Sequence, residues 1–189
     1  MSKPIELLWA FIGLFLTILG TMVEASVANP LGSLTQDTTQ TVSLGVTYQI
    51  GAVLLVGCLG GKNAGALSQI AYVTLGLTPW FPVFAQGGGL GYLSEPSFGY
   101  LLGFIPGAWA CGWLAFQKPC RVEFLGISCL AGLATVHLVG LLYAALLQPS
   151  FSQWWASANL YSWQPLPGQF AIACAVTVLS YLFRLLLFY

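Results

Sequence analysis

The sequence predicts an all-α polytopic membrane protein, a bundle of six transmembrane helices with both termini on the cytoplasmic side. Composition, the lengths of the apolar runs and the placement of the basic residues each support this prediction. Of the 189 residues, 58% are hydrophobic and only 5% are charged, and the mean hydropathy is +0.84. Soluble domains carry about 25% charged residues. The chain is therefore expected to lie in a lipid bilayer, as a single membrane domain over residues 1–189.

Six segments approach the roughly 20 mainly apolar residues that a helix needs to cross a bilayer. They cover residues 5–23, 42–59, 63–77, 98–116, 122–147 and 168–188. The third is short, and the fifth is long enough to tilt or to extend beyond the bilayer. Clusters of Pro, Gly and Asn between the segments predict three long polar loops, at residues 25–41, 78–97 and 148–167.

The basic residues indicate the orientation of the bundle. In a six-span arrangement all five lie on the same side of the membrane: Lys3, Lys62, Lys118, Arg121 and Arg184. Positive charge marks the cytoplasmic loops of membrane proteins. We therefore expect both termini to be cytoplasmic and the three long loops to meet at the external mouth of the bundle.

Several function classes are excluded by what the sequence lacks. It contains no HExxH, GxSxG or Walker A motif, and its net charge of zero offers no basic surface for nucleic acid. The five cysteines have no CxxC spacing, which argues against a metal site and a disulfide framework. We expect them to be buried as small apolar side chains. The prediction is a protein with no catalytic residue, cofactor or metal.

A glycine-rich segment, residues 87–104, leads from the second long loop into an apolar helix. Glycines next to apolar segments are costly unless the backbone bends sharply or approaches something closely. Ligand sites are concave, mainly apolar and carry a few polar groups. A site at the external mouth would use five residues here: Gln86, Gly89, Gly91, Tyr92 and Tyr100. The alternative is that the glycines only form tight turns and the tyrosines only anchor the chain at the membrane interface.

His137 lies midway along the fifth apolar segment, where a polar group is expensive. One interpretation is a hydrogen-bond donor that lines the ligand pocket. The other is a neutral histidine that is bonded to a neighbouring helix. The sequence leaves both open.

The first apolar segment carries small residues at helical spacing on one face: Ala10, Gly13, Thr17 and Gly20. Small residues at this spacing let two helices approach closely in a membrane. The face either packs inside the bundle or forms a docking surface for another membrane subunit.

The order of these motifs resembles BioY, the family of substrate-binding (S) components of energy-coupling-factor (ECF) biotin transporters. The run from Gly65 to Tyr72 resembles the third helix of that family. The pattern GGxGYL…PxxGYLxGF follows between Gly88 and Phe104. The stretches 137–140 and 165–168 fall where the family has a glycine in its fifth helix and a proline–glycine start to its sixth. About two thirds of the chain aligns in this order.

The resemblance implies a six-helix S component that binds biotin at its extracellular side. It implies a transmembrane coupling subunit and two ATPase subunits as partners, docking of the first helix's small-residue face onto the coupling subunit, and the bacterial plasma (inner) membrane as location. The family's sixth helix begins PGDxxK, whose acid and lysine contact the ligand. Here Gln169 and Ile172 replace them.

Without the lysine, a carboxylate ligand loses a charge-assisted hydrogen bond, which is worth about 1.5–3 kcal/mol. Gln169 can still donate from its amide. The sequence therefore leaves four possibilities open: biotin held differently, a neutral relative of biotin, another small ligand, or a structural role in the membrane without transport.

Overall fold

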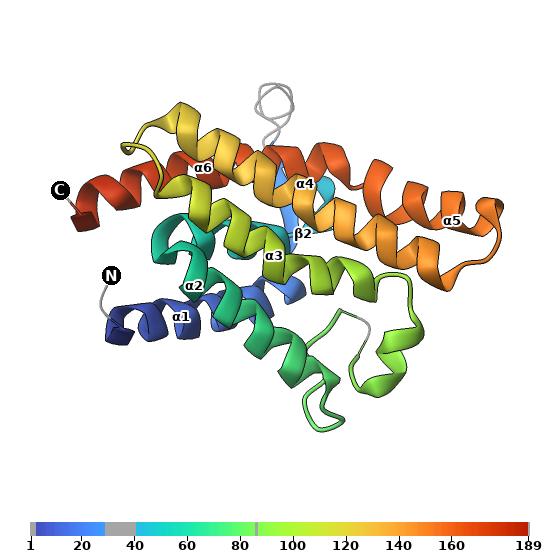
Figure 1. Ribbon diagram of the computed structural model, residues 1–189. Coiled ribbons are helices and arrows are strands. Elements are labelled where there is room, and N and C mark those ends of the chain that lie inside the picture. The colour runs from blue at the N-terminus through green and yellow to red at the C-terminus, as the bar shows by residue number, and fades with distance from the viewer. Residues whose placement is uncertain (1–2, 29–40, 86, 189) are drawn as a thin grey trace.

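The computed structural model describes residues 3–28, 41–85 and 87–188, and it is built mainly from long helices that lie side by side (Figure 1). The elements in chain order are α1 (Lys3–Met22), β1 (Glu24–Ala28), β2 (Thr41–Thr47), α2 (Gln49–Leu77), the short 3₁₀ helix η2 (Leu90–Ser94), α3 (Phe98–Ala115), α4 (Val122–Leu147), α5 (Phe151–Ala158), the π-helical turn η3 (Asn159–Trp163) and α6 (Leu166–Phe188).

Five helical stretches of the described chain are long and apolar enough to cross a membrane: α1, α2, α3, α4 and residues 151–187. The predicted segment 122–147 coincides with α4, and the segments 5–23, 98–116 and 168–188 agree with α1, α3 and α6 to within two residues. The count of five differs from the predicted six because the segments 42–59 and 63–77 both contribute to the single element α2.

Helix α2 reverses its direction at Gly61. Gly61 has φ +80° and ψ −179°, a conformation outside the helical region that favours glycine. The Gln49 Nε2 atom donates to the Tyr72 hydroxyl at 2.9 Å, although the two residues are 23 positions apart. A straight helix would separate them by about 35 Å. Residues 49–60 and 62–77 therefore form two helical segments that run back along each other, and Gln69 on the second donates to Thr17 of α1 at 3.0 Å.

The start of the predicted span 42–59 was wrong, because residues 41–47 form strand β2. This strand pairs antiparallel with β1, which lies at the start of the predicted loop 25–41, and Val27 is the register partner of Val42. Apolar and polar residues alternate along 42–46, which is the period of a strand and not of a helix. Residues 29–40 lie outside the described part of the chain.

The predicted loop 148–167 is also largely helical, since α5 and η3 occupy residues 151–163. Ser150 caps α5 by accepting a hydrogen bond from the backbone N–H of Gln153. The indole N–H of Trp154 donates to the Leu141 carbonyl at 3.1 Å and fixes α5 against α4. The prolines at 165 and 167 pointed to a loop, but they flank and begin α6 instead.

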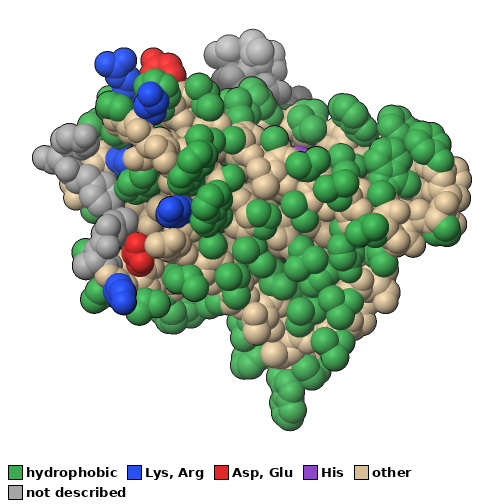
Figure 2. Space-filling view, in the orientation of Figure 1, with side chains coloured by type: hydrophobic (Ala, Val, Ile, Leu, Met, Phe, Trp, Pro, Cys, Tyr) green, Lys and Arg blue, Asp and Glu red, His purple; other side chains and the backbone are tan. Residues whose placement is uncertain are grey.

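Charged side chains gather at the end of the molecule where both termini lie, as the face in Figure 2 shows. We call this the charged end; it holds the turn at Lys62, the C-terminus of α3 and the N-terminus of α4. Arg184 of α6 is 8% exposed there and donates to the Ala115 carbonyl at 2.8 Å. Its guanidinium lies 4.3 Å from the Phe116 ring centroid. A cation at the C-terminus of α3 complements the helix dipole.

Candidate ligand-binding site

A cavity of about 260 Å³ lies at the end of the bundle away from the charged end. The start of α2, the start of α3 and the start of α6 meet there with β2 and η3. Its lining residues are Gly45, Val46, Thr47, Gln49, Ile50, Ala85, Tyr92, Ser97, Tyr100, Leu101, Phe104, Val136, Leu160, Tyr161, Pro165 and Gln169. The lining is mainly apolar with a few polar groups, the composition typical of a small-molecule site.

A chain of hydrogen bonds crosses one wall of this cavity. The Tyr100 hydroxyl lies 2.7 Å from Ser162 Oγ, and Ser162 Oγ lies 2.9 Å from His137 Nδ1. His137 Nε2 lies 2.7 Å from Gln169 Oε1. The four side chains come from α3, η3, α4 and α6, so the network joins four separate elements around the cavity.

The direction of this network follows from its chemistry. Gln169 Oε1 is a carbonyl oxygen and only accepts, so His137 Nε2 donates to it. A neutral imidazole with its proton on Nε2 accepts at Nδ1. Ser162 therefore donates to His137 and accepts from the Tyr100 hydroxyl. In this network Gln169 takes part only through its carbonyl oxygen, so the N–H groups of its amide remain available as donors. Because Gln169 lines the cavity, these N–H groups are placed to donate to a ligand.

Four further polar side chains line the cavity and are not among the predicted site residues: Thr47, Gln49, Ser97 and Tyr161. The Ser97 hydroxyl oxygen is buried, and no described residue forms a hydrogen bond with it. A buried unpaired hydroxyl costs free energy unless something completes it, and a ligand in the cavity would do so. Gln49 is fixed by its bond to Tyr72, whose hydroxyl lies 3.1 Å from Thr21 Oγ1.

An aromatic cluster surrounds Tyr92, the member of the cluster that lines the cavity. The Tyr92 ring centroid lies 4.9 Å from that of Phe84 and 6.4 Å from that of Phe98. Phe98 contacts Tyr143 edge to face at 5.9 Å, and the Tyr143 hydroxyl donates to the Leu93 carbonyl. The loop that carries Tyr92 is thereby packed onto α3 and α4, and the neighbouring rings hold the Tyr92 side chain in place at the cavity.

The predicted site residues divide into four groups. Tyr92, Tyr100 and Gln169 line the cavity, and His137 stands behind Gln169 in the hydrogen-bond network, 8% exposed. His137 thus bonds to neighbouring elements, as the second interpretation expected, and orients a cavity residue at the same time. Gly89 and Gly91 are not among the lining residues. Gln86 lies outside the described residues.

Gly89 forms a turn in the loop that leads to η2. Its φ is +92°, which L side chains rarely adopt, and its backbone N–H donates to the Gly76 carbonyl at 2.8 Å. The turn thus ties the loop to the C-terminal part of α2, which agrees with the alternative that the glycines form tight turns. A Cβ atom on Gly91 would have no neighbouring atom within 4 Å.

The small-residue face of α1 lies inside the bundle. All four of its members are buried: Ala10, Gly13, Thr17 and Gly20. A Cβ atom on Gly13 would lie 2.5 Å from Val56, and one on Gly20 would lie 3.0 Å from the backbone of Gln49. In the structure these residues therefore serve the close approach of α1 to α2, and they are not accessible to a partner. The face of α1 that is exposed carries large apolar residues: Leu7, Leu8, Phe11, Phe15 and Leu19.

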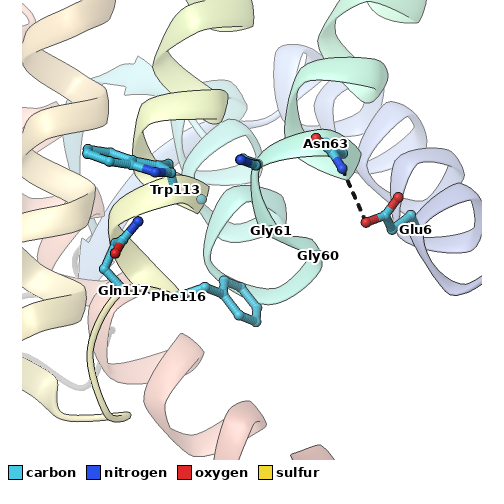
Figure 3. A pocket seen from close by; sticks show the side chains of 9 residues that line it. Glu6, Gly60, Gly61, Asn63, Trp113, Phe116 and Gln117 are labelled. Carbon is cyan, nitrogen blue, oxygen red and sulfur yellow. Dashed lines mark hydrogen bonds between the residues drawn. The ribbon is translucent and has the colours of Figure 1, made fainter. Parts of the chain in front are cut away.

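A second cavity, of about 380 Å³, lies at the charged end beside the turn at Gly61 (Figure 3). Glu6 of α1 and Asn63 point toward each other there, and the Asn63 amide donates to Glu6 Oε1 at 3.3 Å. Phe116 and Gln117 border it from the end of α3. This cavity contains none of the predicted ligand residues.

Relatives of the chain fall into two kinds. An uncharacterized 21.2 kDa protein of Cyanophora paradoxa is 27% identical over 187 residues, which cover 98% of each chain. A probable biotin transporter BioY of Lysinibacillus sphaericus is 39% identical over 104 residues, or 53% of this chain and 52% of that protein. The biotin transporter BioY of Thermotoga maritima is 40% identical over 95 residues, 50% of this chain and 55% of that protein. The matches to these named transporters thus span about half of each.

A solved structure shares the fold. It is the S-component for biotin from an ECF-type ABC transporter, with a TM-score of 0.68 and 21% sequence identity over 97% of this chain and 94% of that one. The model of the BioY family matches residues 5–187. Since this match covers nearly the whole chain, the protein belongs to the BioY family.

Proposed function

We propose that this chain is the membrane-embedded substrate-binding subunit of a biotin uptake system and has no catalytic step of its own. The observation that carries the proposal is the cavity lined by Tyr92, Tyr100 and Gln169 in a chain whose match to the BioY family covers residues 5–187. Relatives named as biotin transporters and the solved biotin S-component support the choice of ligand.

The lining chemistry sets how biotin is held. No Lys or Arg is among the cavity's lining residues, and Ile172, at the family's lysine position, is 4% exposed and packs against Gly51. Neutral donors therefore bond the ligand: the Gln169 amide and the hydroxyl of Ser97. A typical hydrogen bond contributes about 0.5–1.5 kcal/mol and one that involves a charged group about 1.5–3 kcal/mol, so without a cation in the cavity the carboxylate contributes little to selectivity.

Biotin carboxamide tests this mode of binding. We expect it to compete with labelled biotin within about tenfold of biotin itself, because no cation distinguishes the carboxylate from the amide. A preference of a hundredfold or more for the acid would contradict binding by neutral donors. Gln169→Ala is expected to weaken biotin binding by about tenfold while the protein stays folded, and unchanged affinity would remove Gln169 from the site.

We propose that six helical segments cross the membrane, with both termini and the charged end in the cytoplasm. The reversal of α2 at Gly61 supplies the additional crossing, and the positive-inside rule orients the bundle. The cavity then opens to the outside. A reporter fused to the C-terminus that is active only in the cytoplasm tests this orientation; activity only on the external side would reverse it.

The proposed partners are a transmembrane coupling subunit and two ATPase subunits, and the exposed face of α1 is the surface we assign to the coupling subunit. Uptake of labelled biotin into vesicles that contain this chain and those subunits tests the function as a whole. We expect accumulation that requires ATP and this chain. Folded protein that supports no accumulation with any coupling module would contradict it.

The membrane we propose is the plasma membrane of a bacterium; relatives named as biotin transporters occur in Lysinibacillus sphaericus and Thermotoga maritima. Uncharacterized proteins from Cyanophora paradoxa and Mesostigma viride also align over nearly their whole length. Fractionation of the native cells, with detection of the chain in the plasma membrane or in another membrane, decides the location.

A second candidate is a BioY-like bundle that binds a different small ligand or serves as a structural partner in the membrane. The replacement of the family's acid and lysine by Gln169 and Ile172 favours it. Purification from native membranes with a complex other than a coupling module, together with no biotin binding, would favour this function over the first.

A further inference from the structure

Three cysteine sulfurs meet in the interior of the bundle. Cys58 Sγ lies 3.5 Å from Cys111 Sγ and 3.6 Å from Cys129 Sγ, and all three sulfur atoms lie within 4.8 Å of one another. Each residue is 0% exposed. They come from α2, α3 and α4, so the cluster joins three helices on the side of the cavity toward the charged end.

Glycines next to the cysteines let the three helices approach closely enough for the sulfur atoms to be in contact. A Cβ atom on Gly57 would lie 2.9 Å from the Ala108 carbonyl oxygen and 3.3 Å from Cys111 Cβ. One on Gly132 would lie 2.9 Å from Cys111 Cβ. Any larger residue at 57 or 132 would push α2 or α4 away from α3, and the three thiols would separate.

We propose that Cys58, Cys111 and Cys129 bind one univalent copper ion, which ties α2, α3 and α4 together. Three ligands around a metal at about 2.3 Å place the sulfurs about 4.0 Å apart in a trigonal plane, close to the separations of the free thiols. Zinc in structural sites takes four ligands, and no fourth His, Cys, Asp or Glu joins this group among the described residues. Three soft sulfur ligands select Cu⁺.

The surroundings of the cluster suit a thiolate site. Ser180 of α6 is 0% exposed, and its hydroxyl forms no hydrogen bond with a nitrogen or oxygen atom of the described residues. It lies beside Cys58, and Thr177 lies beside Cys129. A buried hydroxyl without an acceptor is costly, and sulfur that becomes thiolate on metal binding would accept from it. Copper displaces thiol protons to the solvent, so its affinity rises with pH.

The alternative is that the three cysteines bind no metal, because buried free cysteines also pack as small apolar side chains. Titration of the detergent-purified chain with Cu⁺, kept reduced with ascorbate and buffered by a chromophoric Cu⁺ chelator, separates the two. The proposal predicts one Cu⁺ per chain and a rise in the thermal unfolding midpoint. No copper retained against the chelator would overturn it.

The other cysteines supply matched controls. Cys58→Ser is expected to weaken Cu⁺ binding by roughly a hundredfold or more. Cys120→Ser and Cys174→Ser are expected to leave Cu⁺ binding unchanged, because Cys120 is half-buried and Cys174 is exposed, and neither belongs to the cluster. Unchanged binding in Cys58→Ser, or loss in either control, would overturn the assignment. Helical circular dichroism and size-exclusion elution verify that each variant is folded. In the wild-type protein, X-ray absorption at the copper edge is expected to show three sulfurs at about 2.3 Å; nitrogen or oxygen ligands would contradict the site.

Discussion

Replacing Ser162 with alanine removes one oxygen atom from the middle of the network that links Tyr100 to Gln169. The Tyr100 hydroxyl and His137 Nδ1 each lose a partner, and both residues are 8% exposed. A buried polar group left unpaired costs about 1–3 kcal/mol. Water that enters from the cavity offsets part of the cost at Tyr100, so we expect a loss of about 2–4 kcal/mol in the free energy of unfolding. Domains are typically stable by about 5–15 kcal/mol, so this loss is readily measured.

The assay is reversible denaturant unfolding of the detergent-purified protein, followed by circular dichroism. Ser128→Ala is the matched control, because Ser128 is equally buried but its hydroxyl donates only to the Phe124 carbonyl of its own helix. That carbonyl can keep its helical hydrogen bond, so we expect a loss of less than about 1 kcal/mol. Equal losses in the two variants would refute the reasoning that the Ser162 oxygen completes a network across elements.

Two further predictions concern stability. Gly89→Ala is expected to lower the free energy of unfolding by about 1–2 kcal/mol, because φ is +92° at this position. Gly91→Ala is expected to be nearly neutral, because its new Cβ atom would lie within 4 Å of no other atom. Equal thermal unfolding midpoints in the two variants would contradict this. Arg184→Met removes the hydrogen bond to the Ala115 carbonyl and the contact with the Phe116 ring and is expected to cost about 1.5–3 kcal/mol in denaturant unfolding. An unchanged unfolding curve would show that the guanidinium does not stabilise the end of α3.

Apolar run length predicted most of the long helices well, and α4 has the predicted bounds, 122–147. Apolar run length gave the wrong element where a short apolar run fits either the start of a membrane helix or a strand. Residues 42–47 are apolar enough for a membrane segment, but they form β2, because β1 supplies a pairing strand that the sequence does not reveal. The reversal of α2 rests on the backbone of Gly61, which lies between the predicted segments 42–59 and 63–77.

The candidate site was only partly predictable. His137 stood out because a polar group inside an apolar segment is costly, Tyr100 because it belongs to the glycine-rich segment 87–104, and Gln169 because it stands where the family has its acid. Ser162 was missed, since it lies in a stretch interpreted as a loop, and its role arises only when η3 lies between Tyr100 and His137. Ser97 gave no signal, because an ordinary serine before a helix is expected as a cap.

The cysteine cluster shows a stricter limit. Cys58 is 53 residues from Cys111 and 71 residues from Cys129, so no local spacing connects them. Metal motifs are recognised when their ligands share a turn or a helix. Here each ligand comes from a different helix. The three sulfurs lie close together because Gly57 and Gly132 let the helices pack closely beside Cys111. Such a site is visible only in three dimensions.

Equilibrium binding of labelled biotin to the detergent-purified protein, with excess unlabelled biotin as the control, decides whether this chain binds biotin. We expect saturable binding at one site per chain that unlabelled biotin displaces. Absence of saturable binding by protein that elutes as a single folded species would contradict the claim that the cavity beside Gln169 is a biotin site.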